Sequence, residues 1–97
     1  MNIFGHPKLS AEKVTTGRFE IEREGDVAYL EYSLTGKILA LIHTEIPEKM
    51  RGQHIASSLI ESALRWAREH HIKVDVICPI VADHIAKHSE YSDLVLR

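Results

Sequence analysis

The stretch MRGQHIASS, residues 50–58, lies where a short loop passes into a helix-like apolar repeat. The first turn of a helix presents backbone N–H groups with no partner inside the helix, and together with the helix dipole they form an anion site suited to a pyrophosphate. Gly52 lets the backbone approach a ligand closely, Ala56 lets the helix begin close to it, and Arg51 adds a cation. A loop that merely caps a helix explains the same residues, so both interpretations stand at this point.

The chain after this turn predicts a helix, a strand and a second helix. Apolar residues over 55–71 recur with a period of about 3.6 residues, which predicts an amphipathic helix. The β-rich run 73–78 predicts a strand that Pro79 ends, and residues 80–88 predict a short helix. The closing residues 89–97 predict a turn and a short extended tail.

Three strands are predicted before the turn. Alternating residues over 18–24 and 27–33 predict two half-buried strands, and glycine-containing turns follow each of them. The run 38–46 predicts a central strand, because its first residues are apolar on both faces. This strand, the long helix and the strand at 73–78 would form a right-handed crossover with parallel strands.

The whole pattern predicts an α/β (α+β) fold with a mixed sheet of about four to five strands and two helices. A ligand is expected at the carboxyl edge of the two parallel strands. Residues 1–17 show no period and are expected to be a flexible N-terminal arm. Residues 18–97 are expected to form a single domain, since a 97-residue chain buries only a modest core.

Composition narrows the class of protein. Apolar residues make up 44% and charged residues 27% of the chain, as in soluble globular proteins. The formal net charge of -2 argues against a dedicated nucleic-acid binder, which would carry a basic face. A single cysteine excludes an internal disulfide, and no apolar run approaches the ~20 residues of a membrane span. We expect a cytoplasmic protein without membrane or nucleic-acid partners, either a monomer or a weak homodimer.

Four short motifs, taken together, resemble a known family. RGQHIA (51–56) resembles motif A of the GNAT superfamily, the acetyl-CoA-dependent N-acyltransferases. HTEIP (43–47), CPIV (78–81) and HSEY (88–91) are similar to three further motifs of a short, stand-alone branch of that superfamily. The match covers roughly residues 18–95 in order. It implies a minimal GNAT-like fold and an N-acetyltransferase that uses acetyl-CoA and an amine acceptor.

The resemblance also implies where acetyl-CoA binds. The cosubstrate would lie between the strands 38–46 and 73–78, with its pyrophosphate on the backbone N–H groups of residues 51–56. The residues implied for binding are Thr44, Arg51, Gly52, Gln53, His54, Ile55, Ala56 and Ser57.

The chain departs from the family pattern at two positions. His54 replaces the motif glycine and Ser89 replaces a proline. Histidine rarely adopts positive φ, but position 54 lies at the start of the helix, so we expect a negative φ with the side chain pointing away from the phosphates. The alternative is a non-catalytic CoA-binding or protein-interaction module in which His54 is the lesion.

His43 and Cys78 are the candidate catalytic residues. An ammonium has no lone pair, so transfer needs a base, and His43 can remove the proton unless it is only a hydrogen-bonded core histidine. Cys78 could be a nucleophile whose pKa His43 lowers, could line the thioester pocket, or could be an inert buried thiol. Direct transfer is the default mechanism of the superfamily. Glu45, on the same strand face as His43, is a second candidate base or a solvated side chain.

Seven histidines also raise the question of a metal site. His84 and His88 are four residues apart on one face of the predicted helix, with Cys78 nearby. Paired cysteines and a His-Glu-x-x-His helix, the common zinc patterns, are both absent from the sequence. We therefore expect no metal cofactor.

Overall fold

The computed structural model describes residues 3–5, 7 and 15–96. Its four-stranded mixed sheet has the order β1-β2-β3-β4. The strands are β1 (Thr15–Arg23), β2 (Asp26–Thr35), β3 (Ile38–Glu45) and β4 (Lys73–Val76). The first three are antiparallel, and β4 runs parallel to β3, as the crossover pattern predicts.

Tight turns join the first three strands where the sequence predicts them. Glu24 and Gly25 have φ of 52° and 87° between β1 and β2, and Gly36 has φ of 59° between β2 and β3. Two consecutive residues at positive φ match the right-handed twist of a hairpin. The sheet therefore begins as a simple meander.

The N-terminal arm is only partly described. β1 begins at Thr15, three residues before the predicted start of the domain, because its pairing with β2 continues to Leu34. Phe4 and Glu20 exchange two backbone hydrogen bonds of 3.1 and 2.8 Å, so part of the expected arm lies on the sheet edge. Residues 1–2, 6 and 8–14 of the arm lie outside the described residues.

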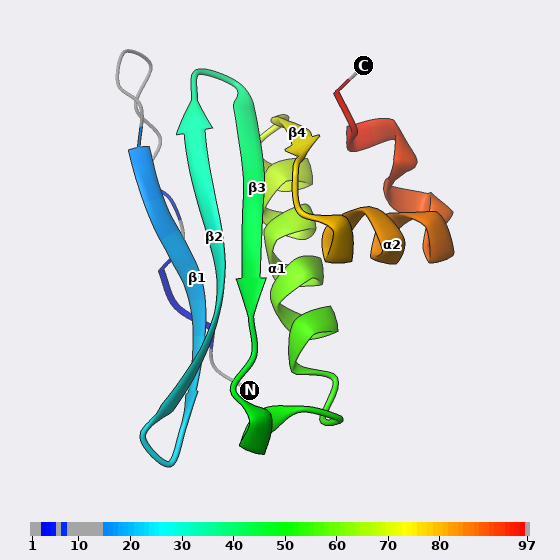
Figure 1. Ribbon diagram of the computed structural model, residues 1–97. Helices are drawn as coiled ribbons and strands as arrows, with labels where there is room; N and C mark the ends of the chain where they lie inside the picture. The colour runs from blue at the N-terminus through cyan, green and yellow to red at the C-terminus, as the bar shows by residue number, and fades with distance from the viewer. Residues whose placement is uncertain (1–2, 6, 8–14, 97) are drawn as a thin grey trace.

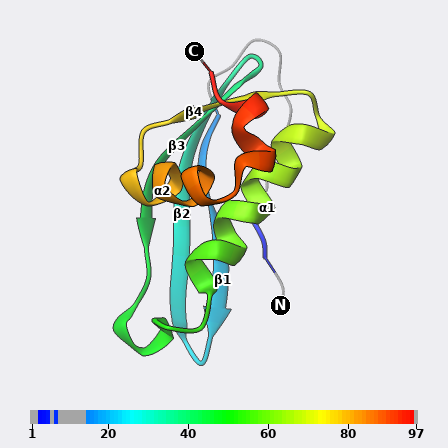
Figure 2. The same ribbon diagram turned by 90° about the vertical axis from the view of Figure 1, so that its right-hand side faces the viewer.

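Two helices cover one face of the sheet, as Figures 1 and 2 show. They are α1 (Ile55–Glu69) and α2 (Pro79–Lys87), and the short 3-10 helices η1 (Glu48–Met50) and η2 (Ser89–Leu94) complete the chain. Proline suits the first helical position, since that residue needs no N–H partner, and α2 begins at Pro79. After η2, Leu96 donates its N–H to Val74 O at 2.8 Å, so the predicted tail lies along β4.

The core lies between these helices and the inner face of the sheet. The largest fully buried side chains come from β1, β2, β3, β4, α1 and α2: Phe19, Ile21, Leu30, Leu34, Leu39, Leu41, Ile55, Leu59, Ile60, Leu64, Val74 and Val81. Among the described residues, no helix covers the outer face of the sheet. Neither helix therefore contacts the outer face.

A bulge in β3 decides which side chains reach that outer face. Tyr32 of β2 pairs with Leu41 of β3, and Glu31, the residue before Tyr32, pairs with His43. Ile42 is therefore one extra residue in β3. A bulge of this kind breaks the period of two. Thr44 consequently lies on the inner face with Leu41, whereas His43 lies on the outer face.

β3 and β4 separate just beyond the bulge. Their pairing ends at Leu41 and Val76. The N–H groups of Ile77 and Cys78 both donate to Leu41 O, at 3.1 and 2.9 Å, before the chain turns into α2. The last residues of β3 therefore have no described strand beside them on that side. The gap is the predicted ligand edge of the sheet.

Candidate active site

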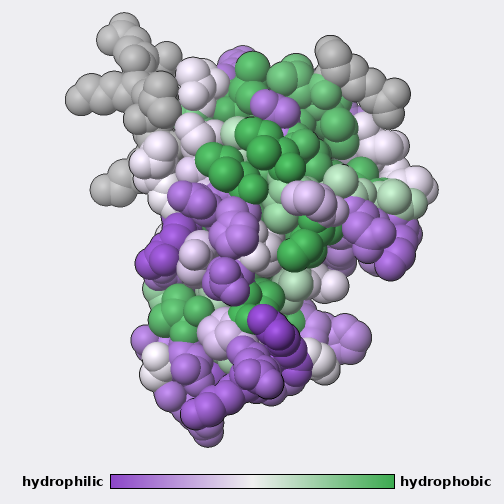
Figure 3. All heavy atoms as spheres, viewed as in Figure 1, coloured by the Kyte–Doolittle hydropathy of each residue, from purple (hydrophilic) through white to green (hydrophobic). Residues whose placement is uncertain are grey.

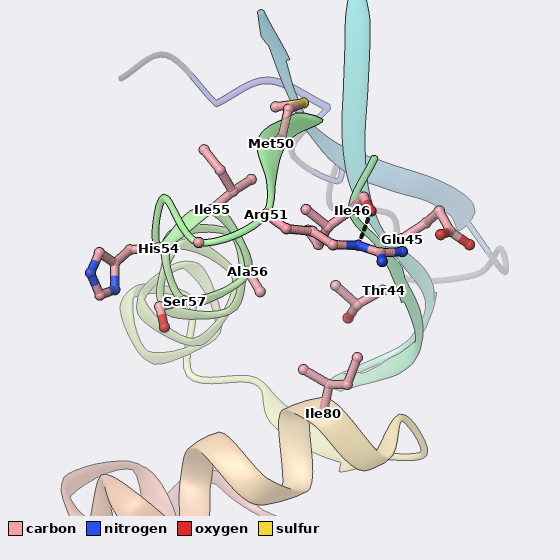
Figure 4. Close-up of a pocket in the computed structure, with 11 residues that line it drawn as sticks. Thr44, Glu45, Ile46, Met50, Arg51, His54, Ile55, Ala56, Ser57 and Ile80 are labelled. Carbon is pink, nitrogen blue, oxygen red and sulfur yellow. Dashed lines mark hydrogen bonds between the residues drawn. The ribbon is translucent and has the colours of Figure 1, made fainter. Parts of the chain in front are cut away.

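A cleft of about 430 Å³ lies between the end of β3 and the start of α1 (Figure 4). Thr44 and Ile80 lie on one side of it and Ala56 on the other, with the Arg51 side chain across it. The lining residues are Thr44, Glu45, Ile46, Met50, Arg51, Gly52, His54, Ile55, Ala56, Ser57 and Ile80. The structure thus gathers the residues implied for acetyl-CoA binding around one cleft, Gln53 excepted.

The expected backbone at His54 is wrong. His54 has φ of 59° and ψ of 25°, the left-handed conformation, whereas we expected negative φ at the start of the helix. The cause is that His54 is the residue before the helix rather than within it, and the loop must turn sharply there to enter α1. The imidazole does point away from the cleft in Figure 4, so it lies on the side where it would not meet a ligand held there.

The first turn of α1 offers free backbone donors. No side chain caps the helix, and its first turn contains no acidic residue. The first amide bonded within the helix is that of Ser58, which donates to His54 O at 3.1 Å. The unpaired donors of such a turn and the helix dipole attract an anion. Gly52, at φ of 78°, has open space where a side chain would begin, so the loop backbone is accessible.

Arg51 and Gln53 point in different directions. Arg51 Nε donates to Ile46 O at 3.2 Å, which stretches the side chain across the cleft and leaves the guanidinium at its mouth. Gln53 instead accepts a hydrogen bond from Arg23 and donates to Lys49 O at 3.2 Å. Gln53 therefore supports the loop from behind and does not line the cleft.

Cys78 lies where β3 and β4 separate. Its side chain is buried, and its Sγ lies 3.5 Å from Thr44 Oγ1. Burial raises the pKa of the Cys78 thiol. Hydrogen bonds from the Thr44 hydroxyl and from the backbone N–H groups of Val81, Ile80 and Thr44 lower it by a larger amount in sum, so the pKa lies below the ordinary value. The thiol does not line the cleft. It is separated from the cleft by Thr44, whose side chain contacts both.

His43 and Cys78 are not brought together. His43 Nε2 lies 3.2 Å from Glu45 Oε1 on the outer face, and both side chains are about half exposed. The groups that lower the pKa of Cys78 do not include His43, which speaks against the possibility, one of the three considered for this thiol, that the histidine activates it. The bulge at Ile42 is the physical reason, because it places His43 on the outer face, whereas strict alternation would place it on the inner face with Leu41.

Sequence reasoning missed several residues around the cleft. Ile46, Met50 and Ile80 provide much of its apolar lining, and Glu45 lines its edge. Ile80 follows Pro79 at the start of α2, so its position could have been inferred from the helix start. The two residues from the loop after β3 carry no comparable signal, since loops follow no period.

Comparisons with known proteins agree with this geometry. A model of the GCN5-related N-acetyl-transferase family matches residues 18–94. The chain belongs to this family. A zebrafish (Danio rerio) relative, Protein NATD1, is 32% identical over 85 residues, covering 82% of this chain and 77% of that protein. The mouse (Mus musculus) Protein NATD1 is 34% identical over 71 residues, 70% of this chain and 64% of the relative.

The fold of this GCN5-related chain also has a solved counterpart. The solution structure of a GCN5-like protein of Staphylococcus aureus superposes with a TM-score of 0.64 over 91% of both chains. The two sequences are 18% identical, so this likeness concerns the fold alone. Among the described residues, none of the helices has the length and apolar character that crossing a membrane requires.

Proposed function

We propose that the protein is an N-acetyltransferase that binds acetyl-CoA in the cleft between β3 and α1 and transfers the acetyl group to an amine. The observation that carries the proposal is the coincidence of two features in one cleft. The uncapped start of α1 supplies donors for phosphate, and the separated ends of β3 and β4 leave room for the thioester arm. Family membership supports the choice of acetyl-CoA as the ligand.

In the proposed complex, backbone N–H groups and one charged side chain bind the phosphates together. The N–H groups at the start of α1 would hold the pyrophosphate, with Arg51 adding a cation at the mouth of the cleft. Ala56 keeps the helix surface low beside the ligand. Thr44 and Ile80, on the opposite wall, would contact the pantetheine arm. The ligand therefore needs little rearrangement of the chain.

The outer face of the sheet supports an amine as acceptor. His43 is paired across β2 and β3 with Glu31, and Glu45 with Tyr29, so two carboxylates accompany the imidazole. Carboxylates attract a cationic amine from solvent. Because no described helix covers this face, the acceptor can reach the end of β3 directly.

In the proposed reaction His43 removes a proton from the ammonium, which leaves a neutral amine, and Glu45 holds the imidazole in place. The amine nitrogen then bonds to the thioester carbonyl carbon, and the C–S bond breaks. The second proton lost by nitrogen goes to the departing thiolate, so the products are an amide and CoA. Cys78 takes no part, because its sulfur is buried and contacts Thr44.

Calorimetric titration with acetyl-CoA and with CoA tests the binding step. We expect one binding site per chain. Ala56→Leu should weaken the affinity at least about tenfold, because the larger side chain fills the cleft and a tenfold loss corresponds to only about 1.4 kcal/mol of binding free energy. Ala86→Leu, an equal change on exposed α2 surface outside the cleft, is the matched control. No binding of either ligand at millimolar concentration would exclude this function.

Acetyl transfer is tested separately, by mass spectrometry of a panel of polyamines, lysine peptides and peptide N-termini. His43→Gln should lower kcat by about 100-fold or more, the usual contribution of a general base. Cys78→Ala should keep full activity, and acetylation of Cys78 itself would instead show a covalent route. CoA binding without transfer to any amine would favour the non-catalytic module.

A further inference from the structure

Three side chains with metal-ligand atoms converge where α1 and α2 meet. Glu61 comes from α1, and His84 and His88 come from α2 and its C-terminal cap. One ligand atom from each lies within 4.8 Å of the other two. The two imidazole rings stack with their centroids 4.3 Å apart. None of the three residues lines the acetyl-CoA cleft.

His84 supplies an independent sign that something is missing from this cluster. Its side chain is 7% exposed, and its Nε2 atom is buried without a hydrogen-bond partner among the residues that the structure describes. The nearest carboxylate oxygen, Glu61 Oε2, is 3.7 Å away, which is too far for a hydrogen bond. Native interiors rarely leave a buried polar atom unsatisfied, so an unpaired nitrogen aimed at a carboxylate and a second imidazole calls for a ligand.

We propose that Glu61, His84 and His88 form a binding site for one divalent transition-metal ion of the zinc class. Imidazole nitrogen and carboxylate oxygen are donors that this class accepts, at bond lengths of about 2.0–2.2 Å. Such bonds place neighbouring ligand atoms about 3.3 Å apart, so the cluster needs to contract slightly. Glu61 and His88 are partly exposed and can move towards the buried His84.

Tyr91 prepares Glu61 for this role. The Tyr91 hydroxyl donates to Glu61 Oε1 at 3.5 Å, while the other oxygen, Oε2, faces His84. One carboxylate oxygen is therefore oriented and the second remains available to the ion. Outer partners of this kind commonly orient metal ligands.

The sequence hides this site because its ligands are far apart along the chain. His84 and His88 have the i, i+4 spacing of a helix face, but the third ligand is 23 positions before the first histidine. Cys78, which the sequence suggested as a partner, is bonded to Thr44 instead. The expectation of no metal site rested on the absence of the common zinc patterns from the sequence, and these patterns do not cover a ligand so far along the chain.

The ion would join the two helices that border the cleft. Ser57 lines the cleft and lies one helical turn before Glu61, and Ile80 lines it and lies one turn before His84. Three protein ligands leave a fourth position of a tetrahedral ion open to water or to an outside ligand. The site therefore stabilises the pairing of α1 and α2 without filling the cleft.

Metal titration of the metal-free chain tests the proposal. Zn²⁺ measured by calorimetry should bind one ion per chain and raise Tm, and Co²⁺ should give the intense visible absorption of a tetrahedral site. Mg²⁺ should do neither, because it prefers six oxygen ligands. Absence of one-to-one Zn²⁺ binding, or several equal weak sites, overturns the proposal.

Variants then locate the ion. Glu61→Gln and His88→Gln keep the size of two partly exposed side chains. Each should weaken Zn²⁺ binding at least about tenfold, because losing even a residue that only orients a metal ligand commonly lowers the affinity by that factor. Tyr91→Phe should weaken it by a smaller factor with the stoichiometry unchanged. His71→Gln, an exposed histidine outside the cluster, is the control. Unchanged affinity in Glu61→Gln and His88→Gln, or a loss in His71→Gln, refutes the assignment.

Discussion

His54 holds a backbone conformation that costs a residue with a side chain about 1–2 kcal/mol relative to its usual regions. Histidine, with asparagine and aspartate, is enriched there among the residues other than glycine. Because the imidazole points out of the cleft, this cost falls on the stability of the loop and not on access for a ligand. The departure from the motif glycine is therefore compatible with a working anion site.

His54→Gly should raise the free energy of unfolding by up to about 1 kcal/mol, since relief of strain exceeds the extra freedom of glycine in the unfolded chain. Urea denaturation measures it, and the acetyl-CoA affinity should stay within about threefold. Gly52→Ala is the control at φ of 78°, where nothing would clash and strain alone should cost about 1 kcal/mol. A destabilised His54→Gly variant contradicts this account.

The Cys78 thiol offers a test of the contacts at the strand fork. Its pKa is lowered by Thr44 and backbone donors despite burial, so the folded chain releases the proton at lower pH than the unfolded chain. The free energy of unfolding should therefore rise with pH between the folded-state pKa and the ordinary thiol value of about 8.5. The ¹³Cβ shift of this single cysteine measures the folded pKa directly.

Thr44→Val removes the hydroxyl that lies 3.5 Å from Cys78 Sγ. The pKa of Cys78 should rise, because fewer hydrogen bonds then oppose the effect of burial. Thr35→Val, at the exposed end of β2, is the matched control and should leave the thiol unchanged. An identical Cys78 titration in both variants would show that the backbone amides alone hold the thiolate.

At the scale of elements, the C-terminal segment is held by polar contacts to α1 and to the start of β4. Arg68 donates to Asp93 at 3.0 and 3.2 Å and to Glu90 O at 2.7 Å, and Lys73 donates to Asp93 O at 2.7 Å. These contacts dock η2 beside α1 and let Leu96 reach β4. They also position Tyr91, whose hydroxyl bonds Glu61.

Arg68→Ala should release this segment. We expect hydrogen exchange of the Leu96 amide to accelerate roughly tenfold, because local opening needs fewer contacts to break. Lys87→Ala removes an exposed ion pair with Asp83 on α2 and should leave Leu96 unchanged. Equal protection of Leu96 in both variants would mean that the Val74 pairing alone holds the tail.

Periodicity and turn chemistry were enough to predict the elements, but not their irregularities. The strands, the two helices, the parallel crossover and the cleft edge follow from residue alternation and from the glycine turns. The bulge at Ile42 cannot be read this way, since strict alternation would place His43 on the face of Leu41. The left-handed His54 depends on how the loop enters α1, and the approach of Glu61 to His84 depends on how the two helices pack.

At the scale of the whole molecule, one core joins every element. Buried side chains from all four strands and both helices form a single cluster. The view in Figure 3 adds that hydrophobic residues also gather on the surface over the upper part of the molecule, whereas the end near the cleft loop is hydrophilic. Exposed Ile38, Ile77 and Leu96 are among the large apolar side chains of the surface.

A single core predicts a single unfolding transition. Trp66, the only tryptophan, is buried in α1, so its fluorescence reports the helix layer, while far-UV circular dichroism also reports the sheet. Urea transitions followed by the two signals should coincide, with an m-value of about 1–3 kcal/mol/M. Separate transitions would mean that the β1–β2–β3 meander and the β3–α1–β4 unit unfold independently.

The extra residue in β3 has a consequence for chain length. A bulge bends its strand and increases its twist, so Ile42 helps β3 diverge from β4 and open the cleft. Deleting Ile42 would leave His43 and Thr44 on their present faces while straightening the strand. The width of the cleft thus depends on the number of residues in β3. We expect a relative one residue shorter between Leu41 and His43 to keep the same cleft-lining side chains around a narrower opening.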